Sequence, residues 1–217
     1  GRGRRLLQRQ GRLHMPLGYA GAFLANTVSR KAMGGWLERV VFSDAREPLP
    51  LKLHDYRTQR VALSAMNLQP SILASCSIPF WLDAVHDIPG APLGAYWDGG
   101  LTDHHLHLDD GSLNDGLVLY PHLQKTVIPG WLDKALKHRH RATAHLDKVV
   151  LLSPRPEWIA TLLNGKLPDR NDFRLYGDDV AGRIAAWSQA LRDSRRWVDE
   201  FAALVGLGKP IEALPPA

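Results

Sequence analysis

Residues 96–103 read Tyr-Trp-Asp-Gly-Gly-Leu-Thr-Asp, and the interpretation of the whole chain starts from this run. The apolar residues 95–97 predict the end of a strand, and Asp98 meets Gly99 and Gly100 directly after it. Asp and Gly are common turn residues, so an isolated Asp-Gly-Gly most often marks only a turn. In α/β folds, however, active residues gather at the carboxyl ends of strands. The run therefore makes Asp98 a candidate catalytic base.

Apolar runs alternate with helical patterns along the chain. Four short runs predict strands, at 39–43, 60–64, 116–120 and 148–152. The first two are expected to form a long hairpin, and the last two to be buried on both faces. Residues 67–75 and the region around 131–137 predict helices. This order predicts an α/β fold, a layered sheet with flanking helices.

The clearest periodic pattern runs from Val180 to Val205, where apolar residues recur at spacings of three and four. It predicts an amphipathic helix that lies against a sheet face. Near the other end, residues 4–32 predict a helix with interruptions at Gly11, Pro16 and Gly18. We expect three parts: a basic helical segment 1–38, an α/β portion 39–208 and a tail 209–217.

The composition limits the class of protein. The 217 residues fit one domain or a large piece of one, and the 45% apolar share allows a sizeable core. The single cysteine, Cys76, excludes an internal disulfide and fits a reducing compartment. No stretch approaches the roughly 20 apolar residues that span a bilayer. We expect a chain that is cytoplasmic or peripheral at the membrane, with an N-terminus that reads as incomplete.

The net charge of +5 is unevenly distributed. Basic residues crowd two places: Arg2, Arg4, Arg5, Arg9 and Arg12, and residues 134–141. Such patches attract phosphate groups, although a solvated face is the commoner meaning. Neither zinc-ligand spacing nor a helix-turn-helix pattern accompanies them, so no nucleic-acid partner is expected.

Residues 71–80, Ser-Ile-Leu-Ala-Ser-Cys-Ser-Ile-Pro-Phe, followed by the Asp-Gly-Gly run, resemble the second half of the patatin-like phospholipases. In that family an Ala-Ser-x-x-x-Pro segment, here with Ser75 and Pro79, precedes the strand that delivers the Asp of a Ser–Asp dyad. The resemblance covers most of the chain from about residue 39. It implies hydrolysis of acyl esters of lipid or phospholipid, with Asp98 as base, Gly99 and Gly100 as its turn, and no cofactor or metal.

The chain departs from the family pattern in three ways. No serine has glycine two places before and two places after it, and no glycine-rich oxyanion loop is found. His104 and His105 follow Asp103, where the family often has Asn and Pro. The resemblance thus implies a chain without the nucleophile half and inactive alone. The alternative is a non-catalytic fragment that binds a lipid surface or anionic phosphate.

Other candidate residues have simpler interpretations. Ser75 and Ser77 are expected to cap or pack at a helix end, and Cys76 to be a small core residue. His105 and His107 share a face, but they supply only two metal ligands. We expect a polar loop rather than a metal site from Asp103, His104, His105, His107, Asp109 and Asp110. We expect a solvated face from His138, His140 and His145. For the tryptophans and Phe80 we expect mostly core positions, with the lining of an acyl cleft as the alternative.

Overall fold

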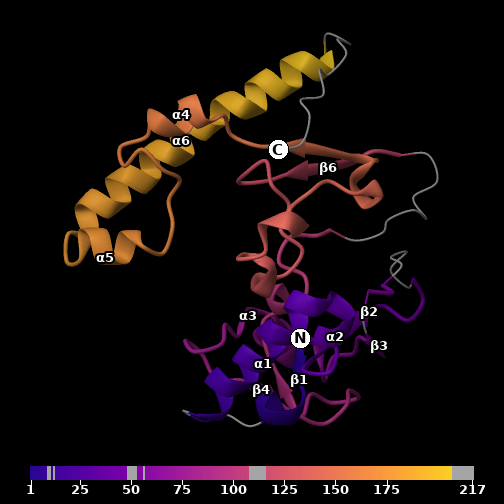
Figure 1. The fold of residues 1–217 in the computed structure, drawn as a ribbon. Coiled ribbons are helices and arrows are strands. Elements are labelled where there is room, and N and C mark those ends of the chain that lie inside the picture. Colours follow the sequence, from indigo (N-terminus) through magenta and orange to yellow (C-terminus); the bar gives the residue numbers. More distant parts are fainter. Residues whose placement is uncertain (9–10, 12, 48–52, 56, 108–115, 207–217) are drawn as a thin grey trace. The chain divides into compact units, whose positions relative to one another are not determined.

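The computed structural model describes residues 1–8, 11, 13–47, 53–55, 57–107 and 116–206 (Figure 1). The chain forms two compact units. Unit 1 comprises Gly1–Val118 and Thr126–Val149, and unit 2 comprises Leu119–Lys125 and Val150–Ala217. The predicted tail 209–217 lies outside the described residues, and the boundaries expected near residues 38 and 208 stay predictions.

Unit 1 is built on a mixed five-stranded sheet with the order β3-β2-β1-β5-β4. Its strands are β1 (Arg2–Gly3), β2 (Leu37–Ser43), β3 (Thr58–Ala62), β4 (Val85–His86) and β5 (Ala95–Tyr96). Its helices are α1 (His14–Val28), α2 (Arg30–Met33) and α3 (Leu68–Cys76). Its 3₁₀ turns are η1 (Arg5–Gln8), η2 (Gly99–Leu101), η3 (Trp131–Asp133), η4 (Lys137–Arg139) and η5 (Ala144–Leu146). The mixed α/β fold class is therefore as predicted.

The two faces of this sheet carry different side chains because strand residues alternate. One face contributes Leu37, Ala95 and Trp97 to a core shared with residues of α1, α2 and η1. The opposite face contributes Val40, Phe42 and Tyr96 to a smaller cluster that includes Ala74 of α3. Helices thus cover both faces near the end of β5.

The pairing of β2 with β3 corrects the predicted hairpin. The two strands are parallel, with Arg39 opposite Thr58 and Ser43 opposite Ala62. A tight hairpin needs a connection of a few residues, whereas parallel pairing needs a crossover of a dozen or more. The connection between Ser43 and Thr58 has that length, so it brings the chain back to the end of the sheet at which β2 starts.

Two of the predicted helices are confirmed and two are corrected. α3 matches the helix predicted at 67–75, and α6 (Val180–Gly206) matches the amphipathic pattern. α1 passes through Pro16 and Gly18 without a break, because Pro16 lies in the first turn, where its missing N–H is not needed. The helix predicted around 131–137 is instead the two short turns η3 and η4.

The apolar runs near 116–120 and 148–152 form β6 (Val118–Pro121) and β7 (Val149–Leu152). These strands make a sheet of their own rather than joining the larger one. Their residues are half-buried or exposed, so the prediction of burial on both faces is wrong. A two-stranded sheet offers too little surface to enclose its strands.

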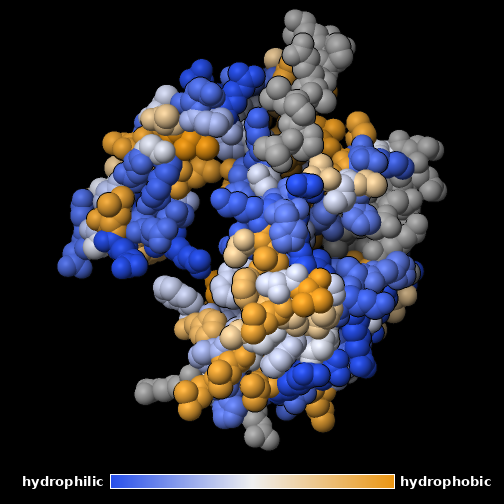
Figure 2. All heavy atoms as spheres, viewed as in Figure 1, coloured by the Kyte–Doolittle hydropathy of each residue, from blue (hydrophilic) through white to orange (hydrophobic). Residues whose placement is uncertain are grey.

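Unit 2 is mainly helical, with α4 (Pro156–Ala160), α5 (Asp172–Tyr176) and the long α6. Trp158 of α4 meets Trp197 of α6 at a centroid distance of 4.4 Å, and Trp187 donates its indole N–H to Asp172 of α5 at 2.8 Å. Among the described residues of unit 2, α6 therefore packs on α4 and α5 rather than on a sheet face. Figure 2 shows apolar side chains at the surface along these helices.

Candidate active site

Asp98 lies between the end of β5 and the start of η2. Its backbone N–H donates to Ser77 O at 2.9 Å, which joins it to the end of α3. Its Oδ1 accepts a hydrogen bond from Gly100 N at 2.6 Å, so Asp98 is the N-cap of η2. Asp is a preferred N-cap residue because its carboxylate satisfies an otherwise unpaired N–H. We call residues 98–101 the Asp98 turn.

Close approach explains both glycines of this turn. A Cβ atom added at Gly99 would lie 3.2 Å from Ser75 Oγ. One added at Gly100 would lie 2.8 Å from Asp98 Oδ1 and 3.4 Å from His104 Nδ1. Neither glycine has a positive φ. They are needed because side chains crowd the turn, not because the backbone is left-handed.

The segment before β5 places its serines and Cys76 differently. Ser77 is buried and donates its hydroxyl to Leu73 O at 3.0 Å, as predicted for a residue at a helix end. Ser75 is exposed in the last turn of α3, beside Gly99. Cys76 is also exposed, so its predicted core position is wrong: it lies on the outer side of a helix whose one buried residue is Ala74.

A cavity of about 310 Å³ opens beside the Asp98 turn on the α3 side of the sheet. Its walls come from β2, α3 and β5 and are mostly apolar, with the hydroxyls of Ser71 and Ser75. Trp97 and Gly99 border it, whereas Asp98 between them does not. A volume of this size suits a small apolar ligand or part of one.

Tyr19 of α1 is a residue that the sequence did not single out. It is 5% exposed, and its hydroxyl has no hydrogen-bond partner among the described residues. Its ring lies 5.1 Å from that of Phe80 and 6.2 Å from that of Trp131. Burial, and next the negative charge of Asp98, raise the pKa of Tyr19. A tyrosine in an apolar helix pattern gives no sequence signal for such a position.

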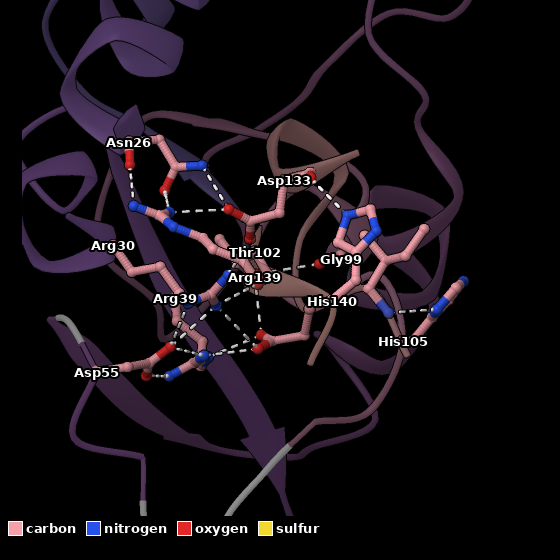
Figure 3. Close-up of polar contacts among 12 residues, drawn as sticks. Asn26, Arg30, Arg39, Asp55, Gly99, Thr102, His105, Asp133, Arg139 and His140 are labelled. Atoms are coloured by element: carbon pink, nitrogen blue, oxygen red, sulfur yellow. Dashed lines mark hydrogen bonds and ion pairs between the residues drawn. The ribbon is translucent and has the colours of Figure 1, made fainter. Parts of the chain in front are cut away.

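A network of alternating charges lies beside the turn (Figure 3). We call it the arginine–aspartate network, with the members Asn26, Arg30, Arg39, Asp55, Asp103, Asp133 and Arg139. Arg39, 3% exposed, binds Asp103 through Nε at 2.7 Å and Nη2 at 2.6 Å. Burying its guanidinium is tolerated because paired carboxylates compensate its charge.

The centre of the network is Asp133, which is fully buried. Its Oδ1 accepts from Asn26 Nδ2 at 2.7 Å and from Arg139 Nη1 at 2.9 Å. Its Oδ2 accepts from Arg30 Nη1 at 2.7 Å. The basic stretch 134–141, predicted as a solvated face, thus contributes Arg139 to a buried ion pair.

Thr102 connects the network to the Asp98 turn. Its hydroxyl lies 3.1 Å from Gly99 O and 3.0 Å from Asp103 Oδ2. Its carbonyl accepts from Arg30 Nη2 at 2.8 Å. The turn is therefore attached to α2 and, through Asp103 and Arg39, to β2.

The histidines near the turn make separate hydrogen bonds. His105 Nδ1 accepts from Ile128 N at 2.8 Å, while His107 Nε2 lies 2.8 Å from Thr143 Oγ1. Burial, and then His145 and Arg30, lower the pKa of His107. In the described part of the chain, no group of three or more metal-ligating side chains converges. Asp109 and Asp110 lie outside the described residues.

His138 and His145 are exposed, as predicted for a solvated face, but His140 is not. It is half-buried, and its Nε2 lies 2.8 Å from Asp133 O. The spacing of residues 133 and 140 gives no signal for this contact, because Asp133 is held by the distant Arg30 and Asn26.

The prediction of mostly core positions for the tryptophans is wrong, because only Trp97, Trp36 and Trp131 belong to or pack against the core of unit 1. Trp97 is 1% exposed in the core of unit 1. In unit 2, Trp158, Trp187 and Trp197 border a second cavity of about 460 Å³. Phe80 is 53% exposed, and its place beside an acyl cleft stays a prediction.

Comparison of the chain with protein-family models, with curated proteins and with solved structures found no match. Over the described ranges, no helix is both long and apolar enough to cross a bilayer.

Proposed function

We propose that the chain is the base-bearing part of a lipid acyl ester hydrolase of the patatin-like class, with Asp98 as the general base. The position of Asp98 carries the proposal. Asp98 follows a strand and caps a turn that contains two glycines. Within the described residues its carboxylate accepts one hydrogen bond, from Gly100 N. A carboxylate has about four acceptor positions, so Asp98 keeps capacity for a further donor.

The chemistry requires that donor to be a serine hydroxyl. In the first step the serine Oγ attacks the ester carbonyl carbon while its proton passes to Asp98. The tetrahedral oxyanion collapses, the alcohol leaves with the proton, and an acyl-enzyme remains. Water, deprotonated by the same carboxylate, then releases the fatty acid. The proposal takes the serine and the oxyanion donors from outside these 217 residues.

The first test is the reading frame upstream of Gly1. A Gly-x-Ser-x-Gly motif and a glycine-rich loop encoded there would support the proposal, and a start codon directly before Gly1 would contradict it. The 217-residue chain alone should give only background hydrolysis of p-nitrophenyl esters.

The second test uses the extended chain. Asp98→Asn should lower kcat/KM by on the order of 10²- to 10⁴-fold, the usual contribution of a general base. Asp87→Asn is the matched control, because Asp87 also accepts a glycine N–H, from Gly94 at 2.8 Å. Equal activity of the two variants would rule out Asp98 as the base.

A second candidate function is binding to a lipid surface without catalysis. The loop after α3 exposes three large apolar residues in succession: Phe80 at 53%, Trp81 at 76% and Leu82 at 51%. Aromatic residues on a surface segment suit the interface of a bilayer. Sedimentation with anionic vesicles should then be lost in Trp81→Ser but kept in Asp98→Asn, and equal sedimentation of Trp81→Ser and the unmodified chain would exclude this function.

A further inference from the structure

Two ionisable side chains border the same small volume above Gly100. Asp98 Oδ1 and His104 Nδ1 lie 2.8 Å and 3.4 Å from the point where a Cβ of residue 100 would sit. Asp98 Oδ1 and His104 Nδ1 are therefore separated by no more than these two distances added together. At about that separation, opposite charges still shift each other's protonation equilibria. Gly100 leaves the space between carboxylate and imidazole open.

His104 is held in this position from two sides. Its backbone N–H donates to Pro129 O at 2.8 Å, and its ring stacks on His105 with centroids 4.4 Å apart and an interplanar angle of 23°. His105 is itself 7% exposed and fixed by the Ile128 N–H. The imidazole therefore faces the Asp98 turn from a supported orientation.

We propose that His104 and Asp98 form an electrostatic pair across Gly100, in which His104 is a positioning residue for the carboxylate. A protonated imidazole attracts the carboxylate toward His104, whereas a neutral imidazole leaves the carboxylate free to meet a serine hydroxyl. The pairing stands on this geometry alone, while its meaning for catalysis rests on the proposed function. In the hydrolase, activity should rise as pH passes upward through the titration of His104.

Other ionisable groups lie near Asp98 and His104. They are Asp103, held by Arg39 and Arg30; His105, stacked on His104; the neutral hydroxyl of Tyr19; and the Gly1 amino group. In the 217-residue chain used for the test, burial lowers the pKa of the Gly1 amino group to about 6, against the effect of Asp103 and Asp98. The test must therefore report on His104 itself.

The test is an NMR titration of the histidine ¹³Cε1 signals in the 217-residue chain, with His104 assigned by its loss in His104→Gln. In Asp98→Asn the His104 midpoint should fall by about 0.5 to 1 in pKa, since a charge at this distance favours the imidazolium by that much. Asn keeps an acceptor for the Gly100 N–H, so the turn is retained. Asp87→Asn should leave the midpoint unchanged, and equal midpoints in all three proteins would overturn the pair.

A reciprocal measurement protects the test against a folding defect in Asp98→Asn. In the unmodified chain, the ¹³Cγ signal of Asp98 should show an inflection at the His104 midpoint, and His104→Gln should remove it. An inflection that persists in His104→Gln would also overturn the pair. These signals need no substrate, so failure of the hydrolase proposal leaves them unchanged. Conversely, loss of turnover in Asp98→Asn without any effect on His104 would leave Asp98 as base and exclude His104.

Discussion

The Asp98 turn and the arginine–aspartate network are joined through Thr102, yet they use their carboxylates in opposite ways. Asp133 is fully buried and accepts hydrogen bonds from Asn26, Arg30 and Arg139. Asp98 is half-buried and, within the described residues, accepts one from Gly100. A carboxylate surrounded by donors stabilises the fold, whereas one with unused acceptor capacity is available for chemistry.

Replacing Asp133 should give the largest effect on stability. Asp133→Asn leaves Arg30 and Arg139 without their buried partner, and breaking such a pair costs about 3 kcal/mol or more. Urea denaturation followed by circular dichroism measures this loss. The exposed Asp147 provides the control, and Asp147→Asn should change the free energy of unfolding by less than about 0.5 kcal/mol. Similar losses in the two variants would contradict the structural role of Asp133.

Gly100→Ala should give the next largest effect. Its methyl group would lie 2.8 Å from Asp98 Oδ1, so either the carboxylate or the turn must move. Overpacking of this kind costs about 1 to 3 kcal/mol. Gly116 has nothing within 4 Å of its added Cβ, so Gly116→Ala is the control and should be neutral or slightly stabilising. A neutral Gly100→Ala would mean that the turn is looser than its contacts indicate.

Asp98→Asn should cost less than about 1 kcal/mol, because the amide oxygen still accepts from Gly100 N. Thermal or urea unfolding checks this against Asp133→Asn. The comparison fails if Asp98→Asn destabilises as much as Asp133→Asn does, since Asp98 would then be a structural carboxylate too.

Acid should remove the smallest contribution, that of Asp55. Burial raises the pKa of this carboxyl, but hydrogen bonds and charge from Arg39 and Arg30 outweigh burial and hold the pKa below its ordinary value of 3.8. Because the folded pKa is the lower one, this stabilisation is present above pH 3.8 and is lost as pH falls through the folded pKa. Asp55→Asn should therefore flatten the fall of unfolding free energy below about pH 4. An unchanged slope would argue against the Arg39 contact.

The elements that were predictable depend on local pattern. The periodicity of residues 180–205 sets α6, and the Asp-Gly-Gly run marks a turn after β5. The parallel pairing of β2 with β3 was not predictable, because it depends on where a long connection delivers the chain. The hydrogen bonds of Arg139 and Asp133 also depend on distant partners, Asn26 on α1 and Arg30 on α2. Local spacing carries no record of such contacts.

The candidate site also has a part that was predictable from sequence and a part that was not. Asp98 and its glycines could be read from sequence, because turn chemistry is local. Tyr19 and the approach of His104 to Gly100 could not, since they arise when α1 and the loop after η2 pack around the turn.

The position of β1 in the sheet determines when its two edges can be covered during synthesis. Arg2 pairs with Glu38 on one side and with Tyr96 on the other, so β1 lies between two strands that follow it in the chain. β1 must wait for β5 before its second edge is covered, and pairing over such a sequence distance is slow. On the ribosome, that edge stays exposed until residue 96 has emerged. The residues of the Asp98 turn emerge directly after this point, so the turn and the closure of the sheet belong to the same stage of synthesis.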